Sequence, residues 1–198
     1  MRRTAIDAQN RCLLQRQQRF RRAADLVADA FAAFPEVEAV ALLGSVARPL
    51  WKDVPRFREF ASAGIKVWHE CSELDLAVWL TALDRLGALR RARAVVLNAA
   101  HKAAGDLGVA SHQVDVFLLE PGTDRYLGRL CDYAECPKRK RDCLTPGCEA
   151  IPFNKVIPEF VRYPDLLDDA AVLYRRGEGR LRSAVNLPGP VAAADGRA

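Results

Sequence analysis

The chain has 198 residues, of which 50% are hydrophobic and 28% are charged. This composition supports a packed core and excludes an intrinsically disordered chain. The formal net charge of +5 is compatible with a phosphate-bearing partner but does not by itself indicate one. No apolar run is long enough to span a bilayer, and no apolar stretch follows Arg2 and Arg3, so we expect a cytoplasmic protein without a membrane partner.

The first part of the chain predicts a long helix and then a strand. From about residue 5 to residue 34, apolar residues recur at steps of three and four, and Pro35 ends the pattern. The arginines of this segment, Arg21 among them, fall largely off the apolar face and indicate a solvated side of the helix. The β-rich apolar run 37–43 predicts a strand, and a Gly-Ser turn follows it directly.

A small insert and a buried strand are predicted next. Asp53 resembles an N-cap for a short helix at about 54–63, and a short strand is expected at 65–68. The run 74–80 is largely apolar, so we expect a strand that is buried on both faces. A helix that ends near residue 106 follows this strand.

Capping residues, turn residues and local composition predict the remaining elements. Thr81 with Asp84 resembles a capping box at the start of the second long helix. A strand at 113–119 is closed by a Pro-Gly turn. Beyond a cysteine-rich segment we expect a helix at about 163–174, and the Ala-, Gly- and Pro-rich residues from about 188 indicate a disordered tail.

Three carboxylates are placed by these strands so that they can meet. Glu73 and Asp75 are two residues apart at the start of a strand, so both side chains can point to the same side. Asp115 occupies the start of the next long strand. If the two strands are neighbours, the three carboxylates converge and repel one another, and a hard cation such as Mg²⁺ relieves that repulsion. Two such ions can orient an attacking oxygen and stabilise a leaving pyrophosphate.

The turn after the first strand adds groups that can bind phosphate. Gly44 allows an anion to approach the backbone closely. Ser45 offers a hydroxyl and an amide, and Arg48 can add a charged donor. Together with the carboxylates, this turn predicts a site for Mg²⁺ and a nucleoside triphosphate.

These residues resemble a known family. The segments 42–45 (Leu-Leu-Gly-Ser), 72–78 (Ser-Glu-Leu-Asp-Leu-Ala-Val) and 114–117 (Val-Asp-Val-Phe) are similar to motifs of the DNA polymerase beta-like nucleotidyltransferase superfamily, in particular its small bacterial members. The resemblance covers about residues 37–120. It implies an α+β fold with a mixed central sheet flanked by helices. It also implies transfer of a nucleotide from a triphosphate to an acceptor hydroxyl.

The resemblance also implies a role for each residue. Glu73 and Asp75 would match the family's paired metal-binding carboxylates, and Asp115 would match the third, which also helps to activate the acceptor. Gly44 and Ser45 would match its triphosphate-binding turn. Two features depart from the family pattern: Glu73 stands where Asp is usual, and the spacer 46–72 is longer than the usual one.

Four cysteines within one short segment predict a second, structural metal site. They form two pairs with four residues between the partners of each, namely Cys131 with Cys136 and Cys143 with Cys148. Four thiolates suit tetrahedral Zn²⁺, and the basic run 138–141 between the pairs would offset their charge. An iron–sulfur cluster, free thiols and two disulfides are alternatives, and the basic run could instead contact RNA or DNA phosphates.

The expected organisation and function follow from these sites. We divide the chain into an N-terminal helical segment, a nucleotidyltransferase-like core, a cysteine-rich metal module, a C-terminal helical segment and a disordered tail, at residues 1–34, 35–122, 123–155, 156–187 and 188–198. The leading hypothesis is a Mg²⁺-dependent nucleotidyltransferase whose acceptor could be nucleic acid, protein, a small metabolite or an antibiotic. The alternatives are a non-catalytic regulatory or antitoxin-like protein on the same scaffold and a zinc-dependent nucleic-acid-binding module.

Overall fold

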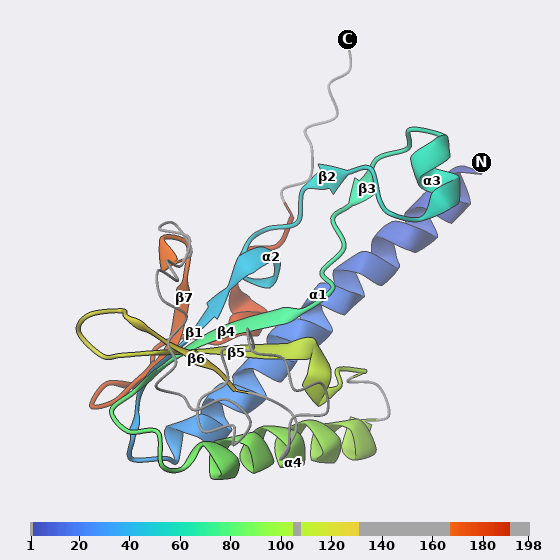
Figure 1. Cartoon of the computed structure of the whole chain (residues 1–198). Coiled ribbons are helices and arrows are strands. Elements are labelled where there is room, and N and C mark those ends of the chain that lie inside the picture. The colour runs from blue at the N-terminus through green and yellow to red at the C-terminus, as the bar shows by residue number, and fades with distance from the viewer. Residues whose placement is uncertain (1, 105–107, 131–166, 191–198) are drawn as a thin grey trace, which may run out of the picture.

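The computed structural model describes residues 2–104, 108–130 and 167–190, which form an α+β fold around a six-stranded sheet (Figure 1). The helices are α1 (Arg3–Ala32), α2 (Gly44–Ala47), α3 (Arg58–Ser62) and α4 (Leu86–Ala104), with 3-10 turns η1 (Ser111–Gln113) and η3 (Ala184–Asn186). The strands are β1 (Val37–Leu43), β2 (Lys52–Asp53), β3 (Val67–Trp68), β4 (Leu74–Leu80), β5 (Val114–Leu119), β6 (Tyr126–Arg129), β7 (Ala171–Arg175) and β8 (Gly179–Arg180).

The large sheet is mixed, as expected, and has the strand order β6-β5-β4-β1-β7-β8. Strands β4 and β5 pair in parallel, whereas the other neighbours in this sheet are antiparallel. A parallel pair needs a crossover connection, and α4 lies in the connection between β4 and β5. The two strands that carry the predicted carboxylates are therefore direct neighbours.

Both long helices pack against one face of this sheet. Phe20, Val27 and Phe31 of α1 are buried in the main core cluster together with Leu89 and other apolar residues of α4. Alternate residues of β4, from Leu74 to Leu80, point into the same cluster. The residues between them face the opposite side of the sheet, where Ala77 belongs to a second, smaller cluster.

The insert forms a separate small unit. Strands β2 and β3 pair antiparallel in a two-stranded sheet of their own, next to α3 and along the N-terminal half of α1 (Figure 1). The backbone N–H of Trp68 donates to Asn10 Oδ1 at 2.9 Å, and Arg16 pairs with Glu70 at 2.9 Å. The insert is therefore attached to α1 and lies outside the six-stranded sheet.

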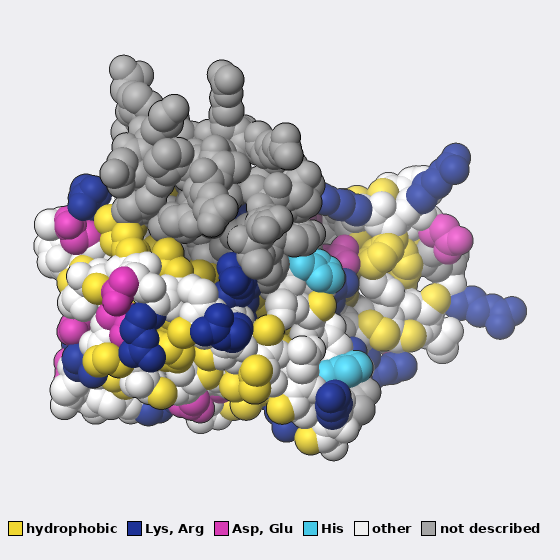
Figure 2. Space-filling model, turned by 60° about the horizontal axis from the view of Figure 1, so that its bottom comes forward, with side chains coloured by type: hydrophobic (Ala, Val, Ile, Leu, Met, Phe, Trp, Pro, Cys, Tyr) yellow, Lys and Arg dark blue, Asp and Glu magenta, His cyan; other side chains and the backbone are white. Residues whose placement is uncertain are grey.

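The described surface has no single basic patch on the face shown in Figure 2, where Lys and Arg side chains lie at several separated places.

Within the described residues, no helix has the length and apolar character needed to cross a bilayer.

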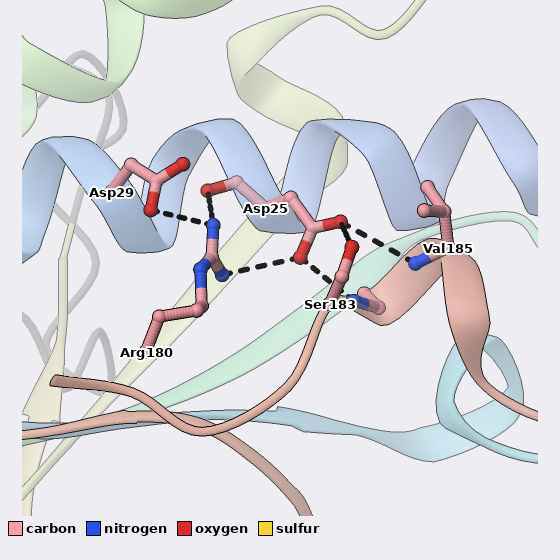
Figure 3. Close-up of polar contacts among 6 residues, drawn as sticks. Asp25, Asp29, Arg180, Ser183 and Val185 are labelled. Carbon is pink, nitrogen blue, oxygen red and sulfur yellow. Dashed lines mark hydrogen bonds and ion pairs between the residues drawn. The ribbon is translucent and has the colours of Figure 1, made fainter. Parts of the chain in front are cut away.

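Asp25 makes several of the contacts that attach the C-terminal segment to α1 (Figure 3). Ser183 Oγ donates to Asp25 Oδ2 at 2.5 Å, and the backbone N–H of Ala184 donates to Asp25 Oδ1 at 2.7 Å. Arg180 donates to the Asp25 side chain at 3.2 Å and to its backbone carbonyl at 2.9 Å, and also pairs with Asp29 at 2.6 Å. Asp25 thereby caps η3 and fixes the approach of β8 to the helix.

Several sequence-based boundaries are wrong for physical reasons that the structure shows. The insert helix is only five residues long, and Asp53 lies in β2, where its carboxylate accepts the N–H of Val54. Helix α4 begins at Leu86, so Thr81 does not cap it; the Thr81 hydroxyl instead donates to the carbonyl of Glu36. The predicted solvated side of α1 includes Arg21, which is fully buried.

The predicted C-terminal helix is wrong in the part of 163–174 that the structure describes. Residues Ala171–Arg175 form β7, which pairs antiparallel with β1 and makes the C-terminal segment part of the core sheet. Ala171 and Leu173 are buried while Val172 and Tyr174 are half-buried, which is the alternation of a strand. The four clustered cysteines, residues 131–166 as a whole and the tail 191–198 lie outside the described residues, so the zinc module stays a prediction.

The C-terminal attachment can be tested with two aspartates of α1. We expect Asp25→Ala to lower the free energy of unfolding by about 2 kcal/mol, because it leaves the part-buried donors of Ser183 and Ala184 without an acceptor. Asp29→Ala removes another partner of Arg180, but that carboxylate is 65% exposed, so its loss should cost less than about 1 kcal/mol. Urea unfolding measures both values, and equal effects would contradict the capping role of Asp25.

Candidate active site

Strand register brings the three predicted carboxylates together. Asp75 of β4 lies directly opposite Asp115 of β5 in the parallel ladder, and Glu73 lies two residues before Asp75. One carboxylate oxygen from each residue lies within 4.8 Å of the other two. This arrangement confirms the predicted convergence, and it includes Glu73 despite the extra methylene of that side chain.

The Gly-Ser turn packs against the central carboxylate. Leu43, the last residue of β1, pairs with Asp75 in the antiparallel ladder, so the chain leaves β1 beside this side chain. Gly44 has a φ of 66°, which L side chains rarely adopt. A Cβ atom on Gly44 would also lie 2.7 Å from Asp75 Oδ2, which is too close for a real contact. Glycine is therefore required at this position both by backbone conformation and by the approach of Asp75.

The surroundings of Asp75 disfavour its charged form. Burial, and then the negative charges of Asp115 and Glu73, raise the pKa of Asp75 from 3.8 to about 6, although the charge of Arg129 lowers it in part. A nearby cation would therefore stabilise the charged form of Asp75, because it would offset the repulsion from Asp115 and Glu73.

Arg129 is a site residue that the sequence analysis missed. It is the last residue of β6 and pairs with Phe117 of β5, and its Nη1 lies 3.1 Å from Asp115 Oδ2. The residue could not be found because no strand was predicted after the Pro-Gly turn that follows β5. The alternation of Tyr126, Leu127, Gly128 and Arg129 after a turn was the only available signal.

Buried side chains of the helices hold the loops of the site. Arg93 of α4 is buried and donates to the carbonyl of Val114, which immediately precedes Asp115. Gln17 of α1 donates to the carbonyl of Ser45 at 3.5 Å. Both ends of the site are thus held from the helical layer, through the backbone rather than through the functional side chains.

A buried thiol lies beneath the Gly-Ser turn. Burial raises the pKa of the Cys71 thiol, while a hydrogen bond with the Ser45 side chain and the charge of Arg21 lower it in part. Cys71 is fully buried and lies two residues before Glu73. The thiol therefore lies next to the Ser45 side chain.

Arg48, the third residue predicted to bind phosphate, has another partner in the structure. Its Nη2 lies 2.7 Å from Asp169 Oδ2, and both side chains are exposed to a large extent. The role of Arg48 toward a triphosphate stays a prediction.

The cluster is a group of residues that could hold a metal ion. Its donors are carboxylate oxygens, the ligands that Mg²⁺ prefers, and Glu73 is its exposed member. Asp75 is half-buried, and the carboxylates of Asp115 and Glu73 lie next to it. Comparison with known proteins gives no independent support, since no family model, curated protein or solved structure matches the chain.

Two glycines allow a direct test of the contact between Gly44 and Asp75. Gly64 also has a positive φ, of 63°, but a Cβ there would have nothing within 4 Å. Gly64→Ala should therefore cost only the backbone strain, about 1–2 kcal/mol of unfolding free energy. Gly44→Ala should cost more, because Asp75 has to move. Chemical unfolding of both variants decides this, and an equal cost would mean that Asp75 is not held against the turn.

The raised pKa of Asp75 predicts how stability depends on pH without metal. The folded protein keeps the proton up to about pH 6, whereas the unfolded chain releases it near 3.8. The free energy of unfolding should therefore fall as the pH rises from about 4 to about 6. Asp75→Asn removes this fall, so the variant should be more stable than the parent above about pH 7 and nearly equal to it below about pH 4.

Urea unfolding in the presence of a chelator measures this dependence. Asp84→Asn serves as the control, because Asp84 is exposed in the loop before α4. A variant Asp75→Asn that follows the parent at every pH would show that the charge of Asp75 costs nothing in the folded protein.

Proposed function

We propose that this chain is a Mg²⁺-dependent nucleotidyltransferase that moves a nucleoside monophosphate from a nucleoside triphosphate to an acceptor hydroxyl. The observation that carries the proposal is the convergence of Glu73, Asp75 and Asp115 beside the Gly44 turn. The order of these motifs along the chain is that of the DNA polymerase beta-like superfamily, and the register of β1, β4 and β5 supports their use as one site.

The three carboxylates would hold the metal. When it is bound, Mg²⁺ would offset the charge of the phosphates and orient them for in-line displacement of pyrophosphate. Asp75 is the central ligand because it lies between Asp115 in the ladder and the Gly-Ser turn. Asp115 faces the same space and would also accept the proton of the acceptor hydroxyl.

The turn would bind the triphosphate. The absence of a side chain at Gly44 leaves the backbone accessible beside Asp75, and Ser45 adds a hydroxyl donor. Arg129 supplies positive charge at the edge of the cluster, where it now pairs with Asp115. A guanidinium at this place is suited to stabilise the negative charge of a phosphate oxygen.

The two departures from the family pattern are compatible with this proposal. The Glu73 side chain reaches the other two carboxylates. The long spacer forms the β2–β3 unit along α1, so it does not separate β1 from β4, which pair along their whole lengths. A non-catalytic protein on the same scaffold remains the second candidate, because Arg129 already offsets part of the negative charge of the cluster without metal.

A binding experiment separates these two functions. Mg²⁺ with a non-hydrolysable nucleoside triphosphate should raise the melting temperature of the parent protein, because both bind the folded state. The same mixture should stabilise Asp75→Asn much less and Asp84→Asn as much as the parent. Pyrophosphate release in the presence of candidate acceptors then tests transfer itself. Equal stabilisation of Asp75→Asn and the parent would remove Asp75 as a metal ligand and make the non-catalytic function the leading one.

A further inference from the structure

A groove of about 580 Å³ opens at the end of α2 that lies away from the carboxylates. It is lined by Ala47, Arg48, Pro49, Trp51, Asp169 and Pro188. Gly44 begins α2 and touches Asp75, whereas Ala47 ends α2 and lines the groove. Three helical steps of about 1.5 Å each separate the two residues along the helix. The groove is shallow and largely open to solvent, so a ligand in it would keep one side exposed.

Trp51 is an aromatic wall of this groove that the protein holds in place. One face of its indole ring is stacked on His69, with the ring centroids 3.9 Å apart and the planes 19° apart. The backbone carbonyl of Trp51 also accepts the N–H of His69 at 2.7 Å. Even so, Trp51 is 42% exposed. A large ring that is fixed on one side and open on the other is suited to stacking against a flat ligand.

Arg48 and Asp169 give the groove a polar edge. Their ion pair, 2.7 Å long, places hydrogen-bond donors and acceptors side by side on the wall of the groove. The pair is neutral as a whole, so it does not select a ligand by charge. It matches a ligand edge that carries both donors and acceptors.

Buried side chains of α1 connect the two walls of the groove. Nη2 of Arg21 donates to the carbonyls of Arg48 and Pro188, at 3.2 and 3.0 Å, and Nη1 donates to Leu187 at 2.7 Å. Gln17 donates to the same Arg48 carbonyl at 2.8 Å. Arg21 is 0% exposed. Two segments far apart in the sequence are thus joined by one buried guanidinium.

We propose that this groove binds a nucleobase, with its ring stacked on Trp51 and its polar edge against Arg48 and Asp169. A nucleobase combines the two properties that the walls require, a flat aromatic face and an edge of alternating donors and acceptors. The base belongs either to the nucleoside triphosphate or to a nucleotide acceptor. The inference rests on the proposed function for its biological meaning, but the binding itself does not require the carboxylates.

Titration with nucleosides that carry no phosphate tests the groove alone. In a buffer that contains a chelator, the parent protein should bind adenosine, guanosine, cytidine or uridine, and calorimetry measures this binding. Trp51→Leu should weaken this binding about tenfold or more, since stacking on an aromatic side chain contributes strongly to base binding. Phe57→Leu is the matched control, because Phe57 is an exposed aromatic residue of the same insert that does not line the groove. It should bind nucleosides as the parent does.

A second variant and a phosphate probe complete the test. Asp169→Asn should change the order of affinity among the four nucleosides. If Trp51→Leu does not fold, this change in order tests the proposal. Inorganic tripolyphosphate should bind equally to the parent and to Trp51→Leu. The proposal is overturned if no nucleoside binds the parent, or if Trp51→Leu and Asp169→Asn both bind nucleosides as the parent does.

One experiment identifies the source of the base, and another separates this proposal from the proposed function. If a non-hydrolysable triphosphate with Mg²⁺ displaces the nucleoside, the groove holds the base of the triphosphate; if both bind together, it holds the base of the acceptor. Either result supports the proposal. Asp75→Asn should still bind nucleosides when it has lost stabilisation by Mg²⁺ and triphosphate. The proposal of a nucleobase groove and the proposal of a metal site can therefore be contradicted separately.

Discussion

The mutual repulsion of three carboxylates at one edge of the sheet is the constraint on which the rest of this structure depends. Oxygens of Glu73, Asp75 and Asp115 lie within 4.8 Å of one another, and Asp75 is also half-buried. The ladder between β4 and β5 places Asp75 opposite Asp115, and the turn at Gly44 lies against Asp75. Glu73, just before β4, is the exposed member of the cluster. The fold therefore stores an electrostatic cost at this edge, which a cation would remove.

Helix α1 is the element that organises the surroundings of this edge. Gln17, Arg21 and Asp25 follow one another at steps of four residues and so lie along one side of the helix. Each of them binds backbone groups of another segment: the Gly-Ser turn and its exit, the end of the C-terminal segment, and η3. The polar side of α1 therefore carries a row of side chains that bind loops. The backbone groups of these loops are not paired within a sheet. This row explains why so long a helix carries buried charge in the middle of its length.

The parts of the structure that could be predicted from the sequence are those that depend on local pattern. Strands β1 and β4 begin and end where their apolar runs do, and the alternation of side chains was sufficient to place Glu73 and Asp75 together. The buried position of Arg21 could not be predicted, since its acceptors are carbonyls more than 20 residues away. Strand β7 was missed because its partner β1 is distant in the sequence, and Arg129 was missed because no strand was predicted after β5. Local propensity favoured a helix at 163–174, and pairing with β1 overrode it in the described part.

The pairing of β7 with β1 has a consequence for the growing polypeptide. Strand β1 is synthesised well before β7, and among the residues that the structure describes this edge of β1 pairs with residues 171–175 alone. Until those residues have left the ribosome, the N–H and C=O groups on that edge have no partner in the final sheet, although β4 can already cover the other edge. The carboxylate cluster can thus assemble from β4 and β5 before the sheet is complete. A nascent chain stalled before residue 171 would expose a strand edge capable of pairing with other chains, a state in which aggregation competes with folding.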